Sequence, residues 1–283
     1  MLISQNVDNI MDVMGCEIID CGERVPFIAI PTTAGTGSEA TMVAVILDPL
    51  KNIKMEFISY HLLPDVAVLD PRMTLTLPPR ITASTGIDVL CHAMEAYTCL
   101  QKNPLSDAFA VGALEMIREN LRIAVKDGKI PKARLAMANA AFMGGSAFSN
   151  SMVGMVHAIG HALGGVCHVP HGEAMTILMP YCMEYNFDIL EDLYGELLLY
   201  IAGAEVYAST PKAKRGRKTI SCIRQINSEF HESCGLPVRL SETETKREDF
   251  ERVAQTAMKD GAMIVNPKQV NQKDVPNILE KAF

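Results

Sequence analysis

The chain has 283 residues, with 26 lysines and arginines against 33 aspartates and glutamates, so its formal net charge is −7. Hydrophobic residues make up 48% and charged residues 21%, values that exclude a disordered or fibrous protein. The acidic excess gives no electrostatic reason to bind nucleic acid, and no apolar run is long enough to cross a bilayer.

The eight cysteines do not have the spacing of a disulfide framework or a zinc ribbon. Cys16 and Cys21 stand five apart, Cys91 and Cys99 share a helix-like segment, and the others are scattered singly. The first twelve residues lack the basic and then apolar order of a secretory signal. We therefore expect reduced thiols and a cytoplasmic protein.

Strand signals are confined to the first quarter of the chain. Short apolar runs bounded by turn residues predict strands at Phe27–Ile30, Val43–Leu47, Met55–Ser59 and Asp65–Pro71. A loop rich in threonine and glycine, Pro31–Thr41, follows the first of them. Its hydroxyls and amides can hold phosphate or ribose oxygens, but its composition alone favours a plain connection between strands.

After Pro78-Pro79 the pattern changes to apolar positions three and four apart, which predicts helices. These are expected at Thr85–Leu100, Asp107–Lys126, Pro131–Met143, Asn150–Gly164, Asp188–Ala202, Thr219–Cys234 and Arg247–Lys259. Gly235 and Gly261 are expected to cap the last two. Strands followed by helices predict an α/β portion, residues 1–79, joined to an all-helical domain, residues 80–283.

Four of the seven histidines lie between residues 157 and 171. His157 and His161 are four apart and should project from one side of a helix. Gly164-Gly165 is expected to end that helix, and a short loop to return His171. His168 is expected to be exposed or to stand behind the ligands. Imidazole is a common neutral ligand of zinc, iron and nickel.

Asp88 and His92 form a second pair four residues apart, among apolar neighbours. A buried charge is costly unless it is paired or bound to metal. Taken alone, each pair also fits ordinary helix residues. In combination, one carboxylate and two or three imidazoles on apolar helices favour a site for a first-row divalent metal.

Three segments together resemble the iron-containing (group III) alcohol dehydrogenases. They are IPTTAGTGSE at 30–39, GIDVLCHAMEA at 86–96 and HAIGHALGGVCHVPHG at 157–172. The likeness runs from about Pro26 to the Asn266–Asp274 region. It implies the dehydroquinate synthase-like fold, in which an α/β remnant of a nucleotide-binding domain precedes an all-helical metal-binding domain.

The resemblance also implies roles for particular residues. Asp88, His92, His157 and His171 match the metal ligands. His161 matches a histidine beside the nicotinamide and is expected to orient it or the substrate, or to relay the hydroxyl proton through water. The positions expected near the cofactor's phosphates and riboses are Thr32, Thr33, Thr36, Thr41 and Lys54.

The implied activity is that of a metal-dependent alcohol dehydrogenase or aldehyde reductase. It transfers hydride between a small alcohol or diol and NAD or NADP, with Fe(II), or zinc, polarising the C–O bond. A homo-oligomer, as a dimer, is expected. Two alternatives stay open: a metal-dependent lyase or hydrolase on the related fold, and a metal-binding remnant with impaired cofactor binding.

One departure from the family pattern concerns the nucleotide. Family members begin with a further mononucleotide-binding portion that carries a Gly-Gly-Gly-Ser-x2-Asp loop, and that pattern is absent from this sequence. We therefore expect a chain shortened at its start, a fragment, or a product that needs a second chain. The metal site is expected to be whole and the cofactor site to be halved.

Overall fold

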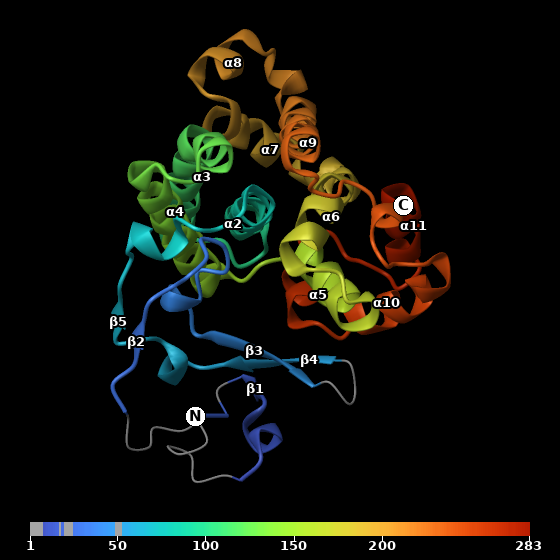
Figure 1. Cartoon of the computed structure of the whole chain (residues 1–283). Helices are drawn as coiled ribbons and strands as arrows, with labels where there is room; N and C mark the ends of the chain where they lie inside the picture. Colours follow the sequence, from blue (N-terminus) through green and yellow to red (C-terminus); the bar gives the residue numbers. More distant parts are fainter. Residues whose placement is uncertain (1–7, 17, 20–24, 49–52) are drawn as a thin grey trace.

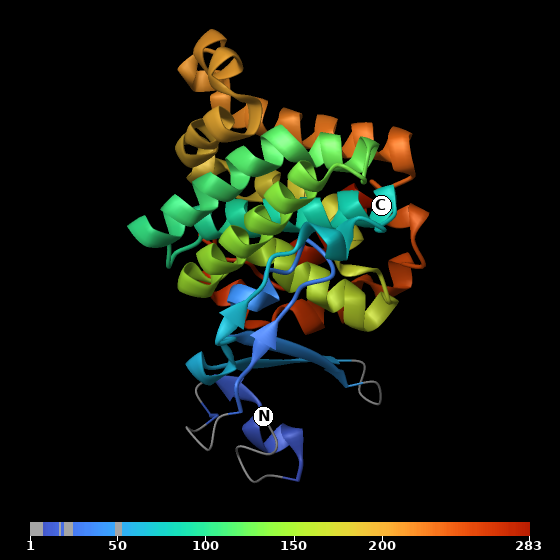
Figure 2. The same cartoon turned by 60° about the vertical axis from the view of Figure 1, so that its left-hand side comes forward.

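The computed structural model describes residues 8–16, 18–19, 25–48 and 53–283. Its strands lie together on one side of a helical bundle, below it in Figures 1 and 2. The described strands are β1 (Gly15–Cys16), β2 (Ile28–Ala29), β3 (Val43–Asp48), β4 (Ile53–Ile58) and β5 (Val66–Ala67). The four predicted strand runs are therefore confirmed as β2 to β5, although β2 and β5 are shorter than expected.

Two small sheets are formed. The first has the order β1-β4-β3, with β1 parallel to β4 and β3 antiparallel to it. The second pairs β2 with β5 in parallel. The β3–β4 pairing aligns Val43 with Ile58 and Ala44 with Phe57. Phe57 is fully buried, and since side chains alternate along a strand, its neighbour Glu56 lies on the other face of the sheet.

From Pro79 onward the chain is mostly helical. The α-helices are α2 (Pro79–Thr98), α3 (Pro104–Lys126), α4 (Pro131–Ser151), α5 (Met155–Cys167), α6 (His171–Tyr185), α7 (Phe187–Ala202), α8 (Ala204–Ser209), α9 (Arg215–Cys234), α10 (Phe250–Ala257) and α11 (Asp274–Ala282). Proline opens α2, α3 and α4, where its missing N–H costs no helical hydrogen bond. No helix among the described residues has the length and apolarity of a membrane span.

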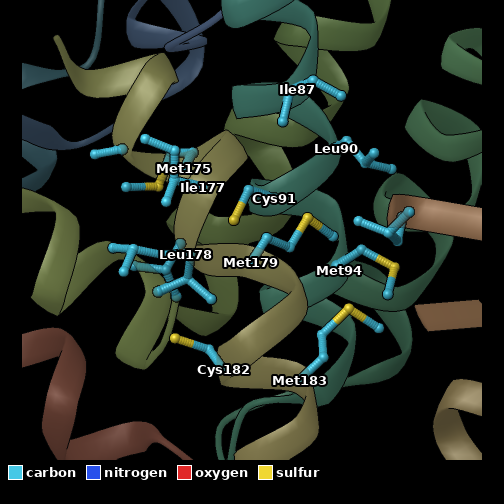
Figure 3. Packing of buried hydrophobic residues seen from close by; sticks show 14 of the residues in the cluster. Ile87, Leu90, Cys91, Met94, Met175, Ile177, Leu178, Met179, Cys182 and Met183 are labelled. Atoms are coloured by element: carbon cyan, nitrogen blue, oxygen red, sulfur yellow. The ribbon is translucent and has the colours of Figure 1, made fainter. Parts of the chain in front are cut away.

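Helix α2 runs through the middle of the bundle and packs against α3, α4 and α6. Figure 3 shows Cys91 and Met94 of α2 beside Met179 and Met183 of α6, in the core between the two helices. Since every residue of α2 from Gly86 to Ala96 is buried, each polar side chain in that stretch needs a compensating partner. The buried polar residues of α2 are therefore candidates for a functional site.

The segment around α5 corrects two expectations. The helix predicted from Asn150 is interrupted, because Met152 has a φ of 70°, and α5 begins only at Met155. The helix also continues through Gly164-Gly165 to Cys167, and His168, with a φ of 58°, makes the turn. His168 itself is exposed.

Two further expectations about loops are wrong. His171 is the first residue of α6, a helix that the apolar pattern did not indicate, and not part of a loop. Gly261 does not cap α10; it opens a short 3₁₀ helix, Gly261–Val265, whose N-cap is Asp260. Gly235 does cap α9 as predicted, with a φ of 69°. The seven cysteines in the described part of the chain are free.

The threonine-rich loop is fixed to α4 through two glycines. Gly37 has a φ of 61° and its backbone lies directly against that of Gly145. A Cβ at Gly37 would overlap the carbonyl oxygen of Ala141, and one at Gly145 would lie 2.5 Å from the Gly37 oxygen. The loop can approach the helix this closely because neither residue has a side chain.

Gly37→Ala is expected to destabilise the protein more than Gly235→Ala. Both glycines have a left-handed backbone conformation, so replacement by alanine lowers the free energy of unfolding by about 1–2 kcal/mol at either position. A Cβ at Gly235 meets nothing within 4 Å, whereas the overlap at Gly37 adds about 1–3 kcal/mol. Denaturant unfolding of both variants measures the difference, and equal losses would contradict the close backbone contact.

Candidate metal centre

The structure brings the four predicted ligands together from three helices. Asp88 and His92 come from α2, His157 from α5 and His171 from the first turn of α6. The Asp88 Oδ1 atom lies 3.9 Å from His92 Nε2, 3.7 Å from His157 Nε2 and 3.3 Å from His171 Nε2. Ligand atoms bound about 2.1 Å from one ion lie about 3–4 Å apart, so these separations fit a shared cation.

Burial supports the same assignment. Asp88, His92 and His157 are buried, and no hydrogen-bond partner satisfies Asp88 Oδ1 or His157 Nε2 in the described part of the chain. A buried carboxylate oxygen without a donor is costly, and a cation would remove that cost. The donor set of one carboxylate and three imidazoles fits Fe(II) or zinc.

The charge states suit a cation as well. Burial lowers the pKa of His92 to about 3, so its imidazole is neutral and has a free electron pair. Burial alone would raise the pKa of Asp88, but His92, His171 and His157 outweigh it and hold the pKa well below its usual range. The site therefore presents an anionic oxygen beside the neutral imidazole of His92. Against burial, which alone would lower it, the neighbouring Asp88, Cys91 and Glu95 raise the pKa of His157 well above its usual range.

A cavity of about 680 Å³ opens onto these ligands. On its helical side lie the three histidines of the cluster, with Phe148 and Met152. On its strand side it is lined by side chains of β3 and β4 and by the threonine-rich loop. The Phe148 ring stacks on His92, with 4.4 Å between ring centroids. The histidine cluster and apolar side chains thus lie together on the helical side of the cavity.

His161 faces the same cavity but lies outside the four-residue cluster. Its Nδ1 atom is 2.8 Å from Asp260 Oδ2 and 3.6 Å from Glu56 Oε1. Burial lowers the pKa of His161. Its ring stacks on that of His171, with 5.3 Å between centroids. One nitrogen is therefore occupied by a carboxylate, which leaves Nε2 for other contacts.

The predicted cofactor residues are only partly brought together. Thr36 and Thr41 line the cavity, whereas Thr32 and Thr33 are not among its lining residues. Lys54 lies in β4, but its side chain is outside the described residues. The loop thus reaches the histidine cavity through its second half.

Glu56 and Asp260 are functional candidates that the sequence did not reveal. Each stood within a segment explained by local structure, Glu56 in a strand run and Asp260 beside a glycine predicted to cap a helix. Their meeting depends on packing β4 against α5 and on the turn before residues 261–265. No spacing rule connects residues so far apart in the chain.

Glu56 is expected to make stability depend on pH. Burial and the neighbouring Asp260 raise its pKa to about 7, so the folded state binds more protons than the unfolded state between about pH 4.5 and 7. As the pH rises through this window, the stability of the wild type should fall relative to that of Glu56→Gln, by at most about 1.4 kcal/mol per pH unit. Denaturant unfolding of both proteins from pH 5 to 8 measures the difference between their free energies of unfolding. A difference that stays constant over this range would refute the raised pKa.

The structure combines a helical domain, which carries a carboxylate–histidine cluster, with an α/β portion that faces the cluster. This arrangement indicates a metal-binding protein, and comparison with known proteins identifies its family. Residues 82–283 match the C-terminal model of the Fe-containing alcohol dehydrogenase family, and residues 1–71 match the iron-containing alcohol dehydrogenase model. The chain belongs to the iron-containing alcohol dehydrogenase family, and the predicted fold class is confirmed.

Individual relatives agree. The chain is 38% identical to alcohol dehydrogenase 4 of Saccharomyces cerevisiae over 92% of its own length and 65% of the relative's. It is 34% identical to an NAD-dependent methanol dehydrogenase of Bacillus methanolicus, over 100% of this chain and 72% of that one. A 1,3-propanediol oxidoreductase structure superposes with a TM-score of 0.91 at 32% identity, covering 99% of this chain and 72% of that one. The chain thus spans about two thirds of the length of these relatives.

Proposed function

We propose that this chain is a metal-dependent alcohol dehydrogenase, and in reverse an aldehyde reductase, acting on a small alcohol or diol with a nicotinamide cofactor. The observation that carries the proposal is the convergence of Asp88, His92, His157 and His171 beside a cavity that the three histidines, His161 and the threonine-rich loop line. Relatives named for methanol, a diol and NAD support the substrate and cofactor classes.

The four clustered residues would hold the divalent metal, Fe(II) in preference to zinc by family. When bound, the metal supplies Lewis acidity at the substrate oxygen. Phe148 and Met152 offer apolar surface to the substrate's carbon chain. Phe148 also restricts the rotation of His92 by stacking on it. The apolar wall excludes water from the reacting carbon and favours a short aliphatic substrate.

His161 is proposed as the catalytic residue that handles the hydroxyl proton. Oxidation of an alcohol releases a hydride from the carbinol carbon to the nicotinamide and a proton from the oxygen. His161 Nε2 takes that proton directly or through water, while Asp260 holds Nδ1 and the ring's orientation. Glu56, partly exposed beside them, offers the next acceptor toward solvent.

The remaining assignments concern the cofactor, the cellular location and the oligomeric state. Thr36 and Thr41 are proposed to hydrogen-bond cofactor oxygens, and Lys54, Thr32 and Thr33 are proposed as further cofactor residues from family position. NAD is favoured over NADP by the NAD-dependent relative. We propose a cytoplasmic homo-oligomer, as a dimer, in line with the free thiols of the described part of the chain.

The direct test uses the full 283-residue chain loaded with Fe²⁺ or Zn²⁺. NAD(H) and NADP(H) are titrated separately, and short primary alcohols and diols are then assayed by nicotinamide absorbance. We expect NAD(H) binding and metal-dependent turnover, with metal-free protein as the inactive control. Metal binding without dinucleotide binding at millimolar levels would overturn the proposal in favour of a metal-binding remnant. Metal-dependent elimination or hydrolysis without redox turnover would favour a lyase or hydrolase.

A further inference from the structure

Glu95 is a buried carboxylate behind the metal cluster, and the mechanism above does not use it. It lies on α2, two turns after Asp88, and is 8% exposed. Its Oε2 atom is 2.5 Å from His157 Nδ1, on the side of the ring away from Asp88. Its Oε1 atom accepts a hydrogen bond of 2.8 Å from the backbone N–H of Val156. Both oxygens therefore contact the first turn of α5.

The start of α5 depends on such distant partners. Its N-cap is Gly154, which has no side chain to accept from the first free amides. Val156 N–H is bonded to Glu95, and Met155 N–H donates to Asn266 Oδ1 at 3.3 Å. A Cβ at Gly154 would lie 2.8 Å from Glu95 Oε1. The glycine thus leaves the space that the carboxylate occupies.

His157 differs in this respect from the other two clustered histidines. No hydrogen-bond partner is found for His92 Nδ1 or His171 Nδ1 in the described part of the chain. A carboxylate only accepts hydrogen bonds, so Glu95 requires the proton on His157 Nδ1. This leaves the electron pair on Nε2, which faces Asp88. A cation held by the cluster would then have a second buried carboxylate, Glu95, behind its His157 ligand.

We propose that Glu95 is a positioning residue for metal binding: it fixes the Nδ1–H tautomer and the rotation of His157 and, through Val156, joins the start of α5 to α2. The inference rests on the proposed metal site. Carboxylates that orient a ligand histidine typically raise metal affinity 10- to 100-fold. Since α2 also carries Asp88 and His92, one carboxylate would set the spacing between α2 and α5, two of the three ligand-bearing helices.

The test measures Zn²⁺ affinity of the full chain by competition with a chromophoric chelator. Glu95→Gln keeps the shape, but its amide can accept from only one of the two donors. We expect affinity to fall about 10- to 100-fold. Glu196→Gln is the matched control, because Glu196 also hydrogen-bonds α2, through Tyr97, but lies outside the site; it should leave affinity unchanged.

A double-mutant cycle separates positioning from general structural damage. Glu95→Gln should have no further effect on Zn²⁺ affinity in a His157→Ala background, but its full effect in a His171→Ala background. Equal effects in both backgrounds, or wild-type affinity in Glu95→Gln, would overturn the inference. Failure of the wild-type chain to bind Zn²⁺ or Fe²⁺ at all would instead overturn the proposed function.

A second variant covers the case in which Glu95→Gln does not fold. Gly154→Ala retains both Glu95 and His157, and its extended backbone, with a φ of −150°, accepts alanine without strain. The added Cβ would displace Oε1 and should lower Zn²⁺ affinity several-fold while the circular dichroism spectrum stays native. Native affinity in this variant would contradict the positioning role.

Discussion

Asp88→Asn is expected to abolish stable metal binding, with Zn²⁺ affinity falling more than about 100-fold. This loss exceeds what is typical for a residue that only orients a ligand. Among the residues that the structure describes, Asp88 Oδ1 is the one carboxylate oxygen within 4 Å of three imidazole nitrogens. Asparagine keeps the size of the side chain but removes the charge that a buried divalent cation needs. Turnover should be lost together with the metal.

Metal content after dialysis and chelator competition measure this prediction. Asp192→Asn, on the exposed surface of α7, is the control for a lost carboxylate and should retain its metal. Thermal unfolding without added metal distinguishes loss of ligand from loss of fold. An Asp88→Asn protein that is folded and binds Zn²⁺ like the wild type would refute the ligand assignment.

His161→Ala is expected to have the opposite combination of effects: it should retain the metal and lose about 100- to 10,000-fold in turnover. His161 Nδ1 is bound to Asp260, and the residue lies outside the group that converges on Asp88. Its removal therefore takes away a proton acceptor without removing a ligand. Asp260→Asn should cause a smaller loss, because the imidazole remains but its orientation is weakened.

The informative comparison is between His161→Ala and His171→Ala. Both remove an imidazole from the same cavity, and the two rings stack on each other. His171→Ala should lose bound metal as well as activity, whereas His161→Ala should lose activity alone. A metal-free His161→Ala protein beside a metal-loaded His171→Ala protein would reverse the two assignments.

Much of the fold could be predicted because its signals are local. Apolar runs gave β2 to β5, and apolar spacing gave α2, α3, α7 and α9. Residues four apart on one helix lie on one side, so the pairing of Asp88 with His92 could be predicted from spacing alone. That they meet His157 and His171 was implied by family resemblance. The role of these residues as ligands stays a prediction.

The errors arise where the local signal and the tertiary structure disagree. Gly164-Gly165 is a plausible helix end, but the helix continues because the turn is made by His168. Helix α6 is buried on several sides, and its sequence therefore lacks the polar stripe that reveals a surface helix. Glu56 and Asp260 meet only through packing of distant segments. Each of these features depends on contacts that no short window contains.

The contacts of α4 have a consequence for redesign of substrate range. Gly145 anchors the threonine-rich loop, and Phe148, three residues later, rests on His92. Three residues of helix span about 4.5 Å. One rigid turn of α4 therefore fixes the distance between the threonine-rich loop and the Phe148 ring. Trimming Phe148 would enlarge room for bulkier substrates without moving the loop, whereas enlarging Gly145 would shift the loop itself. Engineering effort is therefore best directed at the aromatic end of this turn.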